Sequence, residues 1–317
     1  MDYQKYNALL ITQEKNILTV TINRPEKKNA ITAELHGEIC TIFNDIEADD
    51  TVDVVILTGS GGAFCAGGDL TWLLSQHGDP VATSVGIAHD RKLQNTLLDF
   101  EKIIIAKVEG PAVGLGCSLA LLCDFVYATH EAVFADPHVS VGLVAGDGGA
   151  FLWPQLIGYA RARRYLLTGE PISGLEAAAI GLITESVAAD QLDEKVAKMA
   201  ARIARGATHA IKWTKASINA GLKVTDVPPN SQGDSSHLGG SRYCLRTVTR
   251  GYRHLLSPHS TMLIQESDRV LVKFLRSLHL HPVTHLREEH ETHIGTLLQE
   301  VPRPLLWAEL ILDAPKS

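Results

Sequence analysis

Residues 103–116 read IIIAKVEGPAVGLG, an apolar run that passes into a segment with three glycines. The run 103–108 predicts a buried strand, and the uncharged segment that continues to Cys123 predicts a helix. Glycine lets backbone amides approach a ligand closely. Amides near Leu115 would stand at the positive end of this helix, which stabilises a developing negative charge on oxygen. The alternative is a tight turn that binds nothing.

A second glycine-rich segment, 59–69, reads GSGGAFCAGGD and follows the apolar run 52–57. It has the same form, a buried strand that ends in a flexible junction, and a tight turn is again the alternative. A nucleotide site is disfavoured, because residues 114–116 lack the third glycine of GxGxxG and no GxxxxGK[ST] occurs. Strands and helices that alternate around such junctions predict an α/β fold.

The remaining elements follow from apolar periodicity and capping residues. Two apolar runs within 8–23, separated by the polar residues 13–16, predict a hairpin. Helical spacing predicts helices at 32–48, 192–206 and 211–220, and short apolar runs predict strands at 125–128, 132–135 and 182–187. Ser173 with Glu176 forms a capping box, and Asp190 is expected to cap the helix that follows it.

Composition excludes several classes of protein. The 317 residues are 45% hydrophobic and 21% charged, which is typical of a folded globular chain. A net charge of −7 gives no reason to expect a nucleic-acid partner. Residues 1–7 lack a secretory signal and no apolar run is long enough for a membrane span, so we expect a cytoplasmic protein without membrane contact. The five scattered cysteines form no CxxC pair and are interpreted as buried thiols.

The chain changes character after Leu222. Residues from 221 onward hold eight of the fourteen histidines and seven of the thirteen prolines, and only 261–280 and 291–300 look helical. We therefore predict a core domain at 1–206 and an atypical helical C-terminal region at 207–317, poorly ordered after 222. Histidines between 279 and 293, with nearby glutamates, could ligate a metal, but their spacing matches neither HExxH nor a zinc finger. We predict a solvated helical face there and no metal.

Five motifs carry a resemblance to a known family. They are NRPEKKNA at 23–30, AFCAGGDL at 63–70, VEGPAVGLGCS at 108–118, VGLVAGDGG at 141–149, and the stretch that runs from LLTG at 166–169 to Leu182. In order and spacing they resemble the crotonase superfamily, the enoyl-CoA hydratase and isomerase family. The resemblance covers roughly residues 8–222, about two thirds of the chain.

The resemblance implies a crotonase-like spiral of ββα units, with a helical and partly irregular C-terminal region. It implies that an acyl-coenzyme A thioester binds with its carbonyl oxygen between the backbone N–H groups of Gly68 and Leu115. Such an oxyanion hole stabilises the enolate that forms during reactions at the α or β carbon. The family also implies homotrimers or hexamers, with coenzyme A present only as part of the substrate and no other cofactor.

The same resemblance implies residues that hold the coenzyme A part of the substrate. They lie in the two loops around Lys28 and Ala66, at the second glycine junction and in the loop before Asp147: Lys28, Ala30, Ala66, Gly68, Asp69, Leu70, Gly114 and Gly146.

The sequence departs from the hydratase pattern at two positions. Hydratases hold a water between two glutamates, and the matching positions here are Ser118 and His138. Asp147 lies nine residues beyond His138, in a loop that the family places beside the acyl group. We therefore predict that His138 moves a proton and that Asp147 orients its ring, as in the β-diketone hydrolases of the family. Ser118 is a further candidate, either as a group that positions water or as a small residue packed beneath the site.

Other interpretations of these residues stay open. His138 could bond only a loop carbonyl, and Asp147 could only cap its glycine loop. A nucleophilic triad with Ser118 is weakly supported, because no GxSxG elbow is present. For the whole protein, the rivals to a hydratase/isomerase-type enzyme are a β-diketone C–C hydrolase and a non-catalytic acyl-CoA binding protein.

Overall fold

The computed structural model of the protein describes residues 1–76, 80–141 and 143–224. All of them lie in a compact unit that spans Met1–Arg246. The predictions made for the chain after residue 224, including the possible metal ligands between 279 and 293, lie outside the described residues. The domain boundary at residue 206 stays a prediction. None of the described helices is long and apolar enough to cross a membrane.

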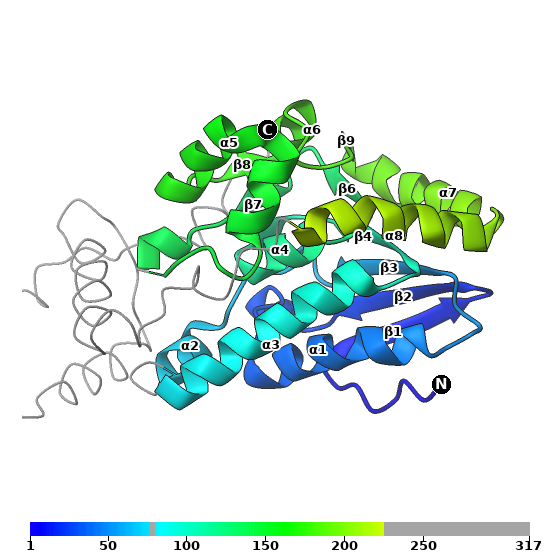
Figure 1. Ribbon diagram of the computed structural model, residues 1–317, viewed down its shortest axis with the longest axis horizontal. Helices are drawn as coiled ribbons and strands as arrows, with labels where there is room; N and C mark the ends of the chain where they lie inside the picture. The colour runs from blue at the N-terminus through cyan, green and yellow to red at the C-terminus, as the bar shows by residue number, and fades with distance from the viewer. Residues whose placement is uncertain (77–79, 142, 225–317) are drawn as a thin grey trace, which may run out of the picture. The chain divides into compact units, whose positions relative to one another are not determined.

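A six-stranded sheet forms the frame of this unit, with strand order β1-β2-β3-β4-β6-β9 (Figure 1). The strands are β1 (Leu9–Glu14), β2 (Ile17–Ile22), β3 (Val54–Gly59), β4 (Ile103–Val108), β6 (Phe125–Thr129) and β9 (Glu185–Val187). The first two form the predicted antiparallel hairpin, and the other neighbours in the sheet are parallel. The predicted strand at 103–108 is confirmed with the same bounds.

A second sheet of three strands has the order β5-β7-β8, formed by β5 (Pro111–Val113), β7 (Val133–Ala135) and β8 (Ile172–Ser173). The chain passes from β4 to β5 and then into helix α4 (Leu115–Leu121). It passes likewise from β6 to β7 and, through a 3-10 turn η2 (His138–Val141), towards helix α5 (Gly149–Thr168). Each of these two turns of the chain thus adds one strand to each sheet and ends in a helix, which agrees with the predicted spiral.

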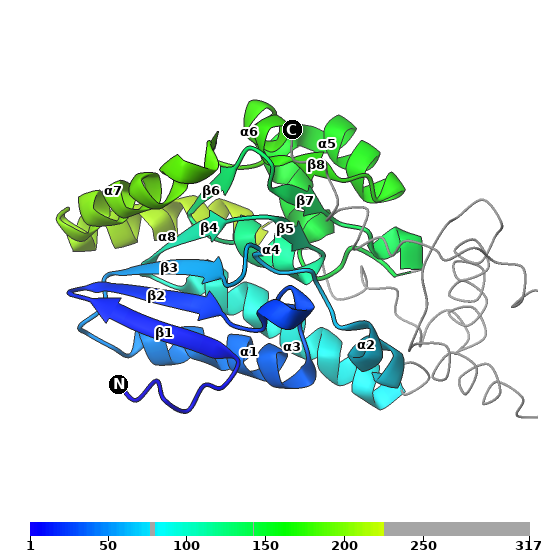
Figure 2. The same cartoon turned by 180° about the vertical axis from the view of Figure 1, so that it is seen from behind.

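Alternate residues of β4 belong to two different cores. Ile104 packs into the larger core, to which α1 (Ala33–Glu47) and α3 (Pro80–Asp99) contribute, and Ile103 packs into a smaller one with α7 (Leu192–Ala204). Because successive side chains of a strand point to opposite faces, a strand buried on both sides must be apolar throughout. In Figure 1, α1 and α3 run side by side in front of β1 to β3, and in Figure 2, seen from the other side, they lie behind these strands.

One of the two predicted helix caps is present in the structure. Ser173 caps helix α6 (Gly174–Ala179), and its Oγ accepts the Glu176 N–H at 3.2 Å, as predicted. The predicted cap at Asp190 is wrong, because that residue lies inside the 3-10 turn η3 (Ala189–Gln191), and Gln191 precedes α7 without a side-chain cap. The other elements are η1 (Pro25–Lys27), α2 (Leu70–Gln76) and α8 (Thr208–Val224), the last of which contains the helix predicted at 211–220.

Candidate active site

The two glycine junctions lie against each other. The Cys65 N–H donates to the Pro111 carbonyl at 2.9 Å, and the Val113 N–H donates to the Cys65 carbonyl at 2.9 Å. A Cβ added to Gly116 would lie 2.6 Å from the Cβ of Cys65, closer than side chains pack. Glycine at 116 therefore permits the contact that brings the two predicted halves of the oxyanion hole into one region.

The Gly68 and Leu115 N–H groups have no acceptor in the described part of the chain. Around Gly68, the Ile31 N–H bonds to Gly67 and the Asp69 N–H bonds to Ile31, so neither bond uses the Gly68 amide. Leu115 is the first residue of α4, where an N–H has no acceptor within the helix. Both amides are thus open to an external acceptor, as the prediction requires.

The Asn29 side chain links the loop around Lys28 to the glycine junction at 59–69. Its side chain is fully buried, donates to the carbonyls of Ser60 and Ala63 at 2.9 and 2.7 Å, and accepts the Arg24 N–H at 2.8 Å. The residue adopts a left-handed φ of 60°, a conformation that asparagine tolerates better than most residues. Its amide group fixes where Lys28 and Ala30 stand.

The residues expected to contact coenzyme A fall into two groups. Most lie in the loops around Lys28 and Ala66, which pair with each other. The Ala66 N–H donates to the Lys28 carbonyl at 3.0 Å. Ile31, next to Ala30, bonds to the residues on either side of Gly68. Asp69 uses its Oδ1 to accept the N–H groups at the start of α2, where Leu70 is the first residue, so this carboxylate caps a helix. The other two lie elsewhere: Gly114 precedes α4, and Gly146 lies in the loop before Asp147.

The structure brings Ser118, His138 and Asp147 together. The Asp147 carboxylate accepts the Ser118 hydroxyl on Oδ1 at 3.0 Å, and its Oδ2 lies 3.2 Å from the His138 Nε2. Ser118 and Asp147 are buried and His138 is partly exposed. Because the serine hydroxyl bonds to the carboxylate, the contacts orient Asp147 and do not form a serine–histidine nucleophilic pair.

Sequence reasoning missed a fourth member of this cluster, Asp136. Its Oδ1 accepts a hydrogen bond from the His138 Nδ1, so each ring nitrogen of the histidine faces a carboxylate. The Asp136 Oδ2 is buried without a hydrogen-bond partner in the described residues. A Cβ added to Gly149 would lie 1.8 Å from this oxygen, so the first residue of α5 has to be glycine.

The His138 ring borders the second glycine junction. Gly114 has a left-handed φ of 53°, and a Cβ added there would lie 3.5 Å from the His138 Cε1 and 3.8 Å from its Nε2. The Nε2 side of the His138 ring, which contacts Asp147, therefore also faces Gly114. This places the imidazole beside the helix start that carries one of the two open amides.

The sequence matches the family described as Enoyl-CoA hydratase/isomerase over residues 12–238. The chain belongs to the enoyl-CoA hydratase/isomerase family. It is accordingly an enzyme of the hydratase/isomerase type. The match continues past Leu222, where the resemblance in the sequence was expected to end.

Similar proteins include members with different reactions. The crotonyl-CoA hydratase of Syntrophomonas wolfei is 33% identical over 70% of this chain and 85% of its own length. The 1,2-epoxyphenylacetyl-CoA isomerase of Escherichia coli is 32% identical over 78% of this chain and 96% of its own length. The crystal structure of an enoyl-CoA hydratase/isomerase from Mycobacterium paratuberculosis aligns with a TM-score of 0.71 and 31% identity, over 78% of this chain and all of that chain.

Within this enoyl-CoA hydratase/isomerase site, His138 is held as an imidazolium. Burial by itself lowers the pKa of the histidine, but the Asp147 charge and the hydrogen bonds to Asp136 and Asp147 outweigh burial. The pKa of His138 is therefore raised well above its usual value. Both ring nitrogens then carry protons, which agrees with a carboxylate facing each of them.

Asp147 is the anionic partner of this ion pair. Burial raises the pKa of a carboxyl group, but the His138 charge, the Ser118 hydroxyl and the Gly149 N–H lower it, and the pKa of Asp147 falls below its ordinary value. The carboxylate also precedes the start of α5, whose positive end favours an anion. The imidazolium and the helix end together explain how a carboxylate stays charged in a buried site.

A metal ion is one alternative occupant of the cluster. Donor atoms of Asp136, His138 and Asp147 lie within 4.8 Å of one another, which is compact enough for one ion. Each ring nitrogen of His138, however, faces a different carboxylate, an arrangement of hydrogen bonds and not of three ligands directed at one ion. The cluster is better described as a hydrogen-bonded ion pair.

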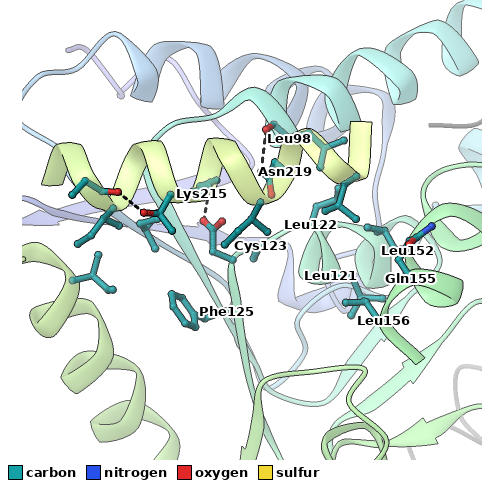
Figure 3. Close-up of a pocket in the computed structure, with 18 residues that line it drawn as sticks. Leu98, Leu121, Leu122, Cys123, Phe125, Leu152, Gln155, Leu156, Lys215 and Asn219 are labelled. Carbon is teal, nitrogen blue, oxygen red and sulfur yellow. Dashed lines mark hydrogen bonds and ion pairs between the residues drawn. The ribbon is translucent and has the colours of Figure 1, made fainter. Parts of the chain in front are cut away.

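A separate pocket of about 580 Å³ lies between α8, α5 and the end of α4 (Figure 3). Most of its lining is apolar, including Leu121, Leu152 and Leu156. The two charged groups of its lining, Lys215 and Asp124, pair with each other at 2.7 Å. The pocket shares no lining residue with the cluster around His138, so it offers no acid or base for the family's chemistry.

Proposed function

We propose that the chain acts on acyl-CoA thioesters and stabilises an enolate between the Gly68 and Leu115 amides. The observation that carries this proposal is that both N–H groups stand at adjoining glycine junctions and have no acceptor in the described residues. The names of the similar proteins, a crotonyl-CoA hydratase and a 1,2-epoxyphenylacetyl-CoA isomerase, support the substrate class. Each preorganised donor to an oxyanion contributes about 10²- to 10³-fold in rate.

In this proposal His138 supplies the proton. The Nε2–H bond of the imidazolium breaks, and its electron pair stays on Nε2. The proton bonds to the enolate carbon through the electron pair of the enolate double bond. The neutral ring that remains can accept a proton in the reverse direction. The 3.2 Å contact between Nε2 and Asp147 is at the long end for such a bond, which leaves the Nε2–H able to share its proton with a substrate atom on the same side of the ring.

The residues around His138 act as positioning groups in the same scheme. Asp136 holds Nδ1, and Asp147 stabilises the imidazolium as the carboxylate of a histidine–aspartate pair does. The Ser118 hydroxyl fixes Asp147 at 3.0 Å. The loops at Lys28 and Ala66 hold coenzyme A, which enters only as part of the substrate, and the subunits assemble as trimers or pairs of trimers.

The His138–Asp147 contact also favours a second activity, hydrolysis of a carbon–carbon bond in a β-dicarbonyl compound. There the same pair would activate water and the enolate would be the leaving group. A third outcome, acyl-CoA binding without turnover, follows if Ser118 and His138 do not replace the two hydratase glutamates. The three differ in two observables, binding of coenzyme A and turnover.

The experiment combines calorimetric titration of coenzyme A and butyryl-CoA with assays of crotonyl-CoA hydration, alkene shift and β-diketone cleavage. We expect acyl-CoA binding, and a loss of turnover in His138→Gln of about 10²- to 10⁴-fold, the usual contribution of an acid–base group. The matched control is His130→Gln, because His130 bonds the Ser186 hydroxyl and, among the residues that the structure describes, no side chain of the cluster. Equal turnover in both variants would contradict the role of His138, and absence of acyl-CoA binding would contradict the substrate class.

A further inference from the structure

The carboxylate oxygens that face His138 are all engaged: both oxygens of Asp147 accept from Ser118 and His138, and Asp136 Oδ1 accepts from His138. The remaining oxygen of the cluster, Asp136 Oδ2, is buried against Gly149 at the start of α5. Reactions that begin with removal of an α proton need a group that can receive it before His138 returns one. A second carboxylate close to the cluster would supply that function.

Asp90, on α3, is such a carboxylate. Its Oδ1 lies 2.7 Å from the Nε2 of His36, and its Oδ2 accepts no hydrogen bond from the described residues. His36 is buried in α1 and its ring lies 5.3 Å from that of Trp72 and 6.0 Å from that of His89. The histidine thus fixes one oxygen of Asp90 and leaves the other available.

The face of α3 that carries Asp90 is turned towards the acid–base loop. Gln94 follows Asp90 by one helical turn, and residues four apart lie on the same face of a helix. The Gln94 Nε2 donates to the Gly146 carbonyl at 3.3 Å, and Gly146 directly precedes Asp147. This hydrogen bond therefore holds the face of α3 that carries Asp90 against the loop that carries Asp147.

The electrostatics agree with this placement. Burial raises the pKa of Asp90, the hydrogen bond and charge of His36 lower it, the charge of Asp147 raises it, and that of His138 lowers it, for a net rise. Cys40, on α1, is a further titratable neighbour, since burial and then the Asp90 charge raise the pKa of its thiol. The effects of Asp147 and His138 on the pKa of Asp90 agree with the contact between α3 and the loop that carries Asp147.

We propose that Asp90 is the base of this site and that His36 is its positioning residue, an inference that rests on the proposed acyl-CoA function. The Oδ2 of Asp90 takes the α proton of the thioester. The electron pair of the broken C–H bond forms the C=C bond of the enolate, and the negative charge moves to the oxygen held by Gly68 and Leu115. In the reverse direction the proton returns from Asp90 to carbon.

The test measures exchange of the α protons of butyryl-CoA and phenylacetyl-CoA in D₂O by NMR, with thioester binding followed by calorimetry. Asp90→Asn keeps the shape and the acceptor for His36 but removes the base. We expect exchange to fall about 10²- to 10⁴-fold with the Kd changed less than about threefold. The control is Asp99→Asn on the same helix, an exposed aspartate paired with Lys223, which should exchange at the wild-type rate.

Two further variants separate chemistry from structure. Asp90→Glu should restore part of the exchange rate, and His36→Gln should lower it less than Asp90→Asn does. If Asp90→Asn does not fold, Asp90→Glu must still change the exchange rate at an unchanged Kd. If either Asp90→Asn or Asp90→Glu exchanges α protons at the wild-type rate, the assignment of Asp90 as the base is wrong, while the proposed acyl-CoA function is unaffected. If the wild-type protein binds neither thioester, the proposed acyl-CoA function itself is wrong.

Discussion

Replacing Asp147 by asparagine keeps the shape of the side chain and removes one of the two charges that face His138. Two unit charges 3.2 Å apart attract by about 5 kcal/mol at an effective dielectric constant of about 20. Loss of an opposite charge at this distance destabilises the protonated ring, so we expect the pKa of His138 to fall in Asp147→Asn.

The sign of the effect on stability follows from the same pair. The pKa of His138 is raised in the folded protein, so its stabilising contribution is full below about pH 6.5 and is lost as the pH rises through the folded value. The pKa of Asp147 is lowered, so its contribution is lost as the pH falls below about 4. Asp147→Asn should therefore lower the free energy of unfolding most between about pH 4 and 6.5, and progressively less above it.

The assay is an NMR titration of protein labelled at the histidine Cε1, with the His138 signal assigned by its absence in His138→Gln. Denaturant unfolding at several pH values measures stability in parallel. Asp193→Asn is the control, because Asp193 is 83% exposed and pairs with Lys107 far from any ring in the cluster. A His138 that titrates at its ordinary value in the wild type, or at the same value in both proteins, would refute the description of the site as an ion pair.

Three glycine positions and one asparagine position give further tests. Gly149→Ala places a Cβ 1.8 Å from the Asp136 Oδ2 and should destabilise the fold by about 1 to 3 kcal/mol in denaturant unfolding. Gly37 is exposed in α1, and a Cβ added there has nothing within 4 Å, so Gly37→Ala should stabilise the fold by about 0.5 to 1 kcal/mol. Asn29→Ala leaves two buried carbonyls without a donor and should cost roughly 2 to 4 kcal/mol by the same measurement. Gly114→Ala forces a side chain to a φ of 53° and should cost about 1 to 2 kcal/mol. Turnover should fall by a larger proportion, because a backbone that relaxes at Gly114 moves the adjacent Leu115 N–H.

Sequence patterns predicted the parts of the fold that local physics decides. The hairpin, the strand at 103–108 and the cap at Ser173 depend on neighbouring residues and are confirmed. No helix was predicted at 149–168, because Pro154 and a non-helical Gly158 interrupt α5 and break its apolar spacing. The strand expected at 182–187 shortens to β9, since the N–H groups of Leu182 and Ile183 bond back to Ala177 in the turn after α6.

The candidate site shows a similar division. Ser118, His138 and Asp147 could be predicted because they fill or adjoin positions that a motif defines, and the structure brings them together. Asp136 was missed although it stands two residues before His138, because its role depends on how the η2 turn aims both side chains at each other. His36 and Asp90 are 54 residues apart, and only the packing of α1 against α3 makes them neighbours.

A protonated His138 brings a positive charge to a position that a glutamate occupies in the hydratases. The carboxylates of Asp136 and Asp147 lie on its two sides and stabilise that charge. In the proposed scheme the imidazolium lies beside the enolate, and opposite charges at close range attract. The scheme also needs a separate base such as Asp90, because a proton already on His138 cannot be the one removed from the substrate.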